Sequence, residues 1–285
     1  MRPASPWHPT FYLDSPLFDS VAAAAASLHT GSGWPDATEL ARALEAHAVR
    51  TLPGRPLVAV PLRDGERNGA AAYELDTWHH GALRVRRDDW HDLLNVLAWC
   101  SLPATKAALN ALHAAALIAA VGATELAETG APQRGRRRDA ATLLDESGVL
   151  LAVSRDDLAA HVRAMRWEAL FVESRAALAT HLRAFVFGHG LLEKALAPYV
   201  GITGHALILE LPPDALRLPR AELLAEVDRR AARRLLDSGA DFGPRDLAPF
   251  PLLGLPGVWP ANEDPAFYRR TDYFRATRGV GRPDR

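Results

Sequence analysis

The chain has 285 residues, of which 48% are hydrophobic and 24% are charged, values typical of globular proteins rather than disordered, fibrous or coiled-coil chains. Its 33 basic and 34 acidic side chains give a net charge of −1, so no global field attracts nucleic acid or an anionic membrane. The single cysteine, Cys100, excludes an internal disulfide framework and a cysteine-built zinc site. The sequence shows no signal-peptide core and no stretch near membrane-spanning length, so we expect a cytoplasmic protein without a membrane partner.

The N-terminal part of the chain alternates helical and strand patterns. Residues 1–19 combine four prolines with large aromatic side chains, which predicts an extended arm rather than a helix. Apolar residues recur at helical spacing behind Asp36 and predict a helix over 35–49. Short strands follow, each bounded by Gly, Pro or Asp. They span 57–62, 71–75 and 81–85.

An alanine- and leucine-rich segment occupies residues 88–121. Because Pro103 lacks a backbone donor, we expect two helices here, with Ser101 as the cap of the second. A polar connector at 123–137 follows. Its end overlaps a basic run at 134–138.

The C-terminal part begins with an expected β-hairpin, whose strands are 140–144 and 149–153 and whose turn is Asp145-Glu146-Ser147-Gly148. Beyond it we expect helices at 154–162, 167–182, 191–196 and 219–236, and strands at 182–187 and 206–211. Residues 241–285 are rich in proline, glycine and aromatic residues, like the N-terminal arm. The sequence therefore predicts one α+β domain over 1–285, with helices around short strands and a hairpin. Its body spans about 20–240, with arms at 1–19 and 241–285 draped on it.

Familiar catalytic motifs are absent from the sequence. It contains no G-x-x-x-x-G-K-[ST], strand-borne G-x-G-x-x-G, H-E-x-x-H, G-x-S-x-G or C-x-x-C. P-loop hydrolysis, zincin proteolysis and α/β-hydrolase chemistry are therefore disfavoured.

Polar side chains gather on one face of each helix expected within 88–121. On the first helix, His91, Asp92 and Asn95 share a stripe about 100° wide. On the second helix, the polar face consists of Lys106, Asn110 and His113. The two faces would form one polar groove wall if the helices stayed in phase. A solvated face, together with an aspartate that caps the helix, is the alternative.

Arg138 and Asp139 precede the expected hairpin. On a strand, Asp139 would share one face with Ala141 and Leu143. We therefore expect Asp139 to point inward, where a buried carboxylate needs an Arg or His partner. Arg138 is a supporting polar residue, and for Asp145-Glu146 the favoured interpretation is a hairpin turn.

His189 stands between Gly188 and Gly190, where a strand is expected to end. Glu193 lies four residues further on, so the pair shares a helical face and could bind one divalent ion or act as an acid and a base. His91, Asp92 or Asp139 would have to supply further ligands. Imidazole and carboxylate suit zinc, manganese or iron, so a divalent metal ion is the candidate cofactor. A chance pair on an ordinary helix is the alternative.

Several of these segments resemble a known bacterial family. They are W-H-D-L-L-N at 90–95, T-K-A-A-L-N-A-L-H at 105–113, Asp139 with Asp145-Glu146, Phe187-Gly188-His189 with Glu193, Gly254-Leu255-Pro256 and N-E-D-P-A-F-Y at 262–268. From about Leu57 to Phe274 the chain resembles domain-of-unknown-function family 3025. The resemblance implies one continuous unit and supplies no activity, cofactor or site residue.

Two functional hypotheses follow. The first is a cytosolic bacterial hydrolase with a polar cleft where His91, Asp92, Asp139 and His189 converge. In it His189 or His91 is a general base or metal ligand, an aspartate orients that histidine, and Glu193 is a further ligand or an acid. The second is a non-catalytic module, binding a small molecule or a protein, in which the same residues cap helices and join segments. Nucleic acid is not an expected partner, because the run 134–138 lacks interleaved aromatic residues.

Overall fold

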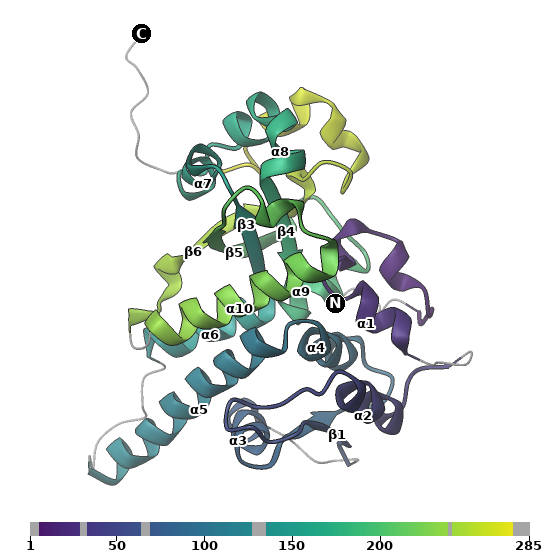
Figure 1. The fold of residues 1–285 in the computed structure, drawn as a ribbon, viewed down its shortest axis with the longest axis vertical. Helices are drawn as coiled ribbons and strands as arrows, with labels where there is room; N and C mark the ends of the chain where they lie inside the picture. The colour runs from purple at the N-terminus through teal and green to yellow at the C-terminus, as the bar shows by residue number, and fades with distance from the viewer. Residues whose placement is uncertain (1–5, 29–32, 64–68, 127–134, 239–240, 276–285) are drawn as a thin grey trace.

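The computed structural model describes residues 6–28, 33–63, 69–126, 135–238 and 241–275, and in them it shows an α+β domain with two sheets (Figure 1). The larger sheet has the order β4-β3-β5-β6, formed by Leu182–Val186, Gly148–Val153, Thr203–Glu210 and Leu247–Pro251. Strands β3 and β5 are parallel, whereas β4 and β6 are antiparallel to their neighbours. The smaller sheet pairs β1 (Val58–Pro61) with β2 (Ala82–Val85) in parallel.

Strand β3 is buried along its whole length and organises the core. Successive side chains on a strand point to opposite faces, and Val149, Leu151 and Val153 accordingly join one apolar cluster while Leu150 and Ala152 join another. Helices α5, α6 and α10 contribute to the second cluster, and α7 together with the C-terminal segment contributes to the first. Because both faces are covered, the strand is a continuous apolar run.

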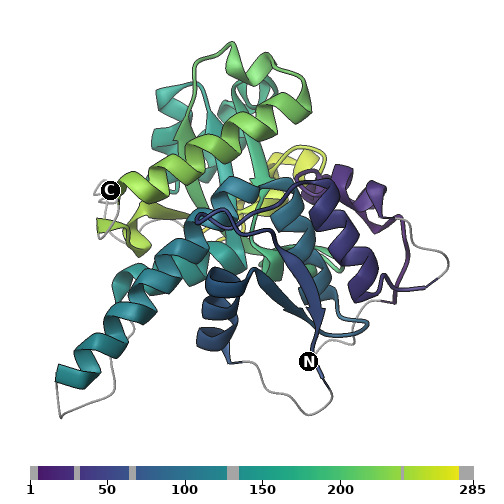
Figure 2. The ribbon, with the colours of Figure 1, turned by 60° about the horizontal axis from the view of Figure 1, so that its bottom comes forward.

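The helices surround this sheet (Figures 1 and 2). They are α1 (Ala22–Ser27), α2 (Ala37–Ala46), α3 (Ala70–His80), α4 (Trp90–Ser101), α5 (Pro103–Leu126), α6 (Arg136–Ser147), α7 (Asp156–Arg163), α8 (Arg175–His181), α9 (His189–Ala195) and α10 (Arg220–Ser238). A π-helical turn, Ala169–Glu173, precedes α8. The free end of α5 projects beyond the body in both views. No helix in the described part of the chain combines the length and apolarity needed to span a membrane.

Several elements are where local sequence predicts them. Helix α2 starts with a capping box in which the Asp36 carboxylate accepts hydrogen bonds from the Thr38 and Glu39 backbone, and the Glu39 carboxylate accepts one from the Asp36 backbone N–H. Strands β1 and β2 form as expected, and the long helical segment is split at Pro103.

The first turn of α5, however, is capped from elsewhere in the chain. Ser101 is the last residue of α4 rather than the cap of α5. The carboxylate of Asp228 on α10 accepts the backbone N–H of Ala104 at 2.9 Å and of Thr105 at 2.7 Å. A tertiary contact therefore satisfies the free backbone N–H groups that a local cap was expected to satisfy.

Two expected strands are wrong. Residues 71–75 belong to helix α3, and residues 140–144 belong to helix α6. Both segments are rich in good helix formers such as Ala, Leu and Glu, and residues 70–76 contain no β-branched residue. The hairpin partner of β3 is replaced by β4, which takes the antiparallel position beside it.

The two ends of the chain pack onto the core where the structure describes them. Short 3-10 turns at Phe11–Leu13 and Pro16–Phe18 bury Phe11 and Phe18. The Phe11 ring lies edge-on to Trp90, 4.9 Å between centroids, and so supports the start of α4. In the C-terminal segment, the sequence analysis did not predict strand β6. This strand contains two prolines, which a sheet tolerates because β6 lies at its edge.

Candidate functional site

A pocket of about 690 Å³ opens beside the end of the large sheet where β3 begins and β4 ends. Side chains from α3, α4, α5, α6 and α9 line it, and its volume lies in the range of small-molecule sites. His91, Glu146 and His189 share one region of its wall. The pocket is therefore the candidate functional site.

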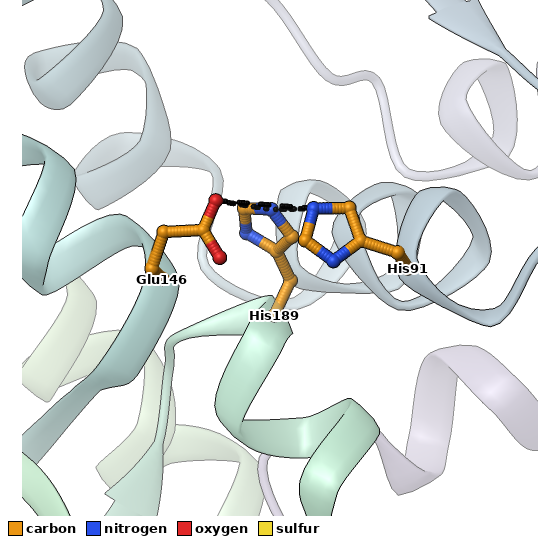
Figure 3. Close-up of side chains that lie close together, drawn as sticks. All are labelled: His91, Glu146 and His189. Carbon is orange, nitrogen blue, oxygen red and sulfur yellow. Dashed lines mark hydrogen bonds and ion pairs between the residues drawn. The ribbon is translucent and has the colours of Figure 1, made fainter. Parts of the chain in front are cut away.

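The three side chains point toward one another from three helix ends (Figure 3). His91 is the second residue of α4, His189 is the first residue of α9, and Glu146 is the penultimate residue of α6. The Nε2 atoms of the two histidines are 2.9 Å apart. Glu146 Oε1 lies 3.6 Å from His189 Nε2 and 3.8 Å from His91 Nε2. His189 is buried, with 5% exposure, whereas His91 and Glu146 reach the pocket surface.

Two glycines let α9 approach the end of α6 closely. A Cβ on Gly188 would lie 2.4 to 2.5 Å from backbone atoms of Glu146, Ser147 and Gly148. A Cβ on Gly190 would lie 2.5 Å from Glu146 Oε2. Side chains at these positions would push His189 and Glu146 apart, so the glycines set the distance between the two.

We expect Gly188→Ala to destabilise the protein by about 1 to 3 kcal/mol, because the methyl group meets backbone that cannot rotate away. Gly33→Ala is the matched control, because a Cβ there has no atom within 4 Å. Thermal unfolding followed by circular dichroism measures both. Equal melting temperatures for the two variants would contradict the close approach of α9 and α6.

Each histidine of the cluster has a carboxylate at its other ring nitrogen. His91 Nδ1 lies 3.0 Å from Glu193 Oε2, and this hydrogen bond raises the pKa of His91. On His189, Nδ1 is buried without a hydrogen-bond partner of normal geometry among the described residues, and Asp145 Oδ2 lies 3.7 Å away. The Glu193 carboxylate favours a proton on His91 Nδ1, and the Asp145 carboxylate, although beyond hydrogen-bond distance, favours a proton on His189 Nδ1. With both protons there, the Nε2 lone pairs face each other.

Asp145 is itself held by a buried cation. Lys106 Nζ lies 2.5 Å from Asp145 Oδ1, and the ammonium sits over the rings of Trp99 and Phe187. Burial alone would raise the pKa of Asp145, but Lys106, with His189, outweighs it and brings the pKa to about 2. Burial lowers the pKa of His189 to about 3. His189 is therefore neutral and Asp145 ionised at neutral pH.

The facing Nε2 atoms need a proton or a cation between them. Two lone pairs 2.9 Å apart repel unless one proton or one cation lies between them. Donors about 2.1 Å from a tetrahedral zinc ion are about 3.4 Å from one another. The observed separations of 2.9, 3.6 and 3.8 Å are close to that value. The residues present therefore fit a divalent metal ion, and the carboxylates at both Nδ1 atoms are the usual outer partners of metal-bound histidine.

The wall formed by α3 and α5 carries a second polar group. Asn110 Nδ2 donates to Glu74 Oε2 at 2.8 Å, and Asn95 Nδ2 donates to the Tyr73 hydroxyl at 2.6 Å. Burial and the charge of Asp145 raise the pKa of Glu74 to about 7. Burial lowers the pKa of His113 to about 4. The pocket thus contains a carboxyl group that can exchange its proton at neutral pH.

The structure brings together some of the residues that the sequence analysis placed in one site, but not all of them. His91 and His189 meet, and Glu193 adjoins them as the partner of His91 Nδ1 rather than as a member of the three-atom cluster. Asp92 lines the pocket, but Arg86 holds its carboxylate with contacts of 2.9 and 2.7 Å. Asp139 is exposed in the first turn of α6 and does not line the pocket. Its inward orientation was wrong because it depended on a strand.

The remaining sequence candidates are polar residues in or beneath the pocket. Asn95, His113 and Arg138 line it, while Lys106 and Asn110 contact lining carboxylates. Sequence reasoning missed Glu146, Asp145, Tyr73 and Glu74. The spacing of Arg138, Thr142, Asp145 and Glu146 is a helical polar stripe, but the D-E-S-G turn signal outweighed it. Arg134, the first residue of the basic run, lies outside the described residues.

The fold and the site define an α+β protein with a two-histidine, one-carboxylate cluster in a polar pocket. No curated protein and no solved structure matches the chain. A family model described as "Protein of unknown function (DUF3025)" matches residues 60–278. The chain belongs to this family.

Proposed function

We propose that the protein is a divalent-metal-dependent hydrolase in which His91, His189 and Glu146 hold the metal. The observation that carries the proposal is the 2.9 Å separation of the two Nε2 atoms, with Glu146 beside both and a carboxylate at each Nδ1. Two imidazoles and a carboxylate with one side open to a pocket are the donor set of catalytic zinc sites, and manganese and iron accept the same donors. A metal there would act as a Lewis acid and lower the pKa of a bound water.

Glu74 is our proposed proton acceptor. Glu74 lines the pocket from α3, and Asn110 fixes its carboxyl group. The charge of Asp145, the residue next to Glu146, contributes to the raised pKa of Glu74, so Glu74 lies within electrostatic range of the cluster. A carboxylate near neutral pKa in the same pocket can take a proton from a water and return it to a leaving group.

The test is the metal content of protein purified without chelator. We expect near-stoichiometric zinc, manganese or iron by elemental mass spectrometry in the wild-type protein, and loss of that metal in His189→Ala and Glu146→Gln. Glu263→Gln is the matched control, because Glu263 is exposed and is not among the residues that line the pocket. A wild-type protein that stays metal-free after incubation with each ion would refute the proposal.

A non-catalytic binding or scaffold module is the second candidate, because the cluster residues join three helices, α4, α6 and α9. In that case His189→Ala should lower the melting temperature by several degrees, since unpairing a buried network costs about 1 to 3 kcal/mol. A functional residue behaves in the opposite way, because its removal leaves apo-protein stability unchanged or raised. The single, buried Cys100 supports our further proposal that the protein acts in the reducing cytoplasm of a bacterium.

A further inference from the structure

We propose that the pocket takes an elongated substrate whose far end carries an anionic group, a carboxylate or a phosphoryl group, and that Arg138 binds this group. The inference rests on the proposed metal function, because the cluster would bind the reacting end. Its physical basis is the shape of the pocket and the distribution of unpaired charge along it.

The pocket follows the length of two packed helices. On α6, Arg138, Thr142, Asp145 and Glu146 recur at helical spacing along one face, and all four line the pocket. Arg138 and Glu146 are eight residues apart, which corresponds to about 12 Å along the helix axis. Lys106 of α5 contacts Asp145 at the cluster end. His113, seven residues further along α5, lines the pocket with Arg138.

Arg138 is available for a ligand, whereas the other cations at the pocket are engaged. Arg86 binds Asp92 at 2.7 Å, Arg84 binds Asp76 at 3.4 Å and Lys106 binds Asp145 at 2.5 Å. The side chain of Arg138 makes no hydrogen bond or ion pair with any residue that the structure describes; only its backbone N–H is bonded, to Gly135 O at 2.8 Å. A half-buried guanidinium with all its donors free is a ready partner for carboxylate or phosphate oxygens.

The charge balance favours the same class of substrate. The carboxylates of Glu146 and Glu193 offset the charge of a metal dication at the cluster, so Arg138, whose side chain has no carboxylate partner among the described residues, is the uncompensated positive charge of the pocket. Glu74 also lines the pocket, and its pKa near 7 means that it is partly protonated at neutral pH. An anionic group of a substrate is therefore attracted to the Arg138 end of the pocket.

The experiment uses hydroxamates, which bind active-site metal ions, joined by linkers of increasing length to a carboxylate, a phosphonate or an uncharged methyl ester. Calorimetry on the zinc-loaded full-length protein measures their affinities. We expect one anionic series to bind about tenfold or more tightly than the ester at an intermediate linker length. This advantage should disappear in Arg138→Gln and persist in Arg136→Gln, since Arg136 is exposed on the same helix. The series with the larger gain in affinity, carboxylate or phosphonate, identifies the anionic group that Arg138 binds.

The outcomes separate this inference from the metal proposal. Ester and anionic hydroxamates of equal affinity at every length would overturn the anion site and leave the metal site intact. An anionic advantage that survives in Arg138→Gln would also overturn it. Failure of every hydroxamate to bind, together with no zinc by elemental analysis, would overturn both proposals. Arg138→Lys should recover only part of the advantage, because an ammonium cannot form the paired bonds of a guanidinium.

Discussion

Replacing Lys106 with methionine is expected to lower the free energy of unfolding by about 3 to 5 kcal/mol at pH 7. Lys106 is 4% exposed, and its Nζ lies 2.5 Å from Asp145 Oδ1. Methionine fills similar space between Trp99 and Phe187 but leaves the Asp145 carboxylate buried without its cation. Denaturant unfolding of the apo-protein measures the loss. Lys194→Met is the matched control, because Lys194 is the chain's other lysine and is exposed.

The double variant Lys106→Met, Asp145→Leu should recover most of this stability, since neither buried charge remains. Its metal affinity should nevertheless stay lower by about 10- to 100-fold, because His189 Nδ1 has lost its carboxylate partner. A cost below about 1 kcal/mol for Lys106→Met would show that water or a neighbouring cation compensates Asp145. Full metal affinity in the double variant would show that Asp145 does not orient His189.

Replacing Glu74 with glutamine should stabilise the apo-protein at pH 7.5 and leave its stability nearly unchanged at pH 4. Burial and Asp145 raise the pKa of Glu74 to about 7, against about 4.3 in an unfolded chain. Between these values the folded state holds a proton that the unfolded state has released, so wild-type stability falls as pH rises through this window. At about 1.4 kcal/mol per pH unit, and allowing for partial exposure, the loss reaches about 2 to 3 kcal/mol.

Glutamine does not titrate and can keep the hydrogen bond to Asn110, so the variant escapes this loss. Unfolding curves of both proteins are measured across pH 4 to 7.5. The difference between their free energies of unfolding isolates the contribution of Glu74 from that of His113, which has the opposite dependence on pH. His113 has its pKa lowered to about 4 and therefore contributes stability above about pH 6.5 that is lost on acidification. Glu45→Gln, on the exposed surface of α2, should show no pH-dependent difference. A Glu74→Gln effect that is constant with pH would refute the raised pKa.

The sequence by itself determined the features that depend on near neighbours. The capping box at Asp36, the split at Pro103 and the apolar run of β3 each act within a few residues, so their signals are local. The sequence also indicated His91 and His189 as site residues, because one opens a polar helix face and the other follows a strand between two glycines. Their separation of 2.9 Å required the structure.

Only the tertiary structure decided which carboxylates accompany the two histidines. Residues 140–144 can form a strand beside β3 or the helix α6, and the choice follows from β4, distant in sequence, occupying the antiparallel position beside β3. As part of a helix, Glu146 reaches the cluster and Asp139 turns to solvent. Glu74 enters the pocket for the same kind of reason, since α3 replaces an expected strand. Its raised pKa comes from burial and from Asp145, and residues distant in the chain supply both effects.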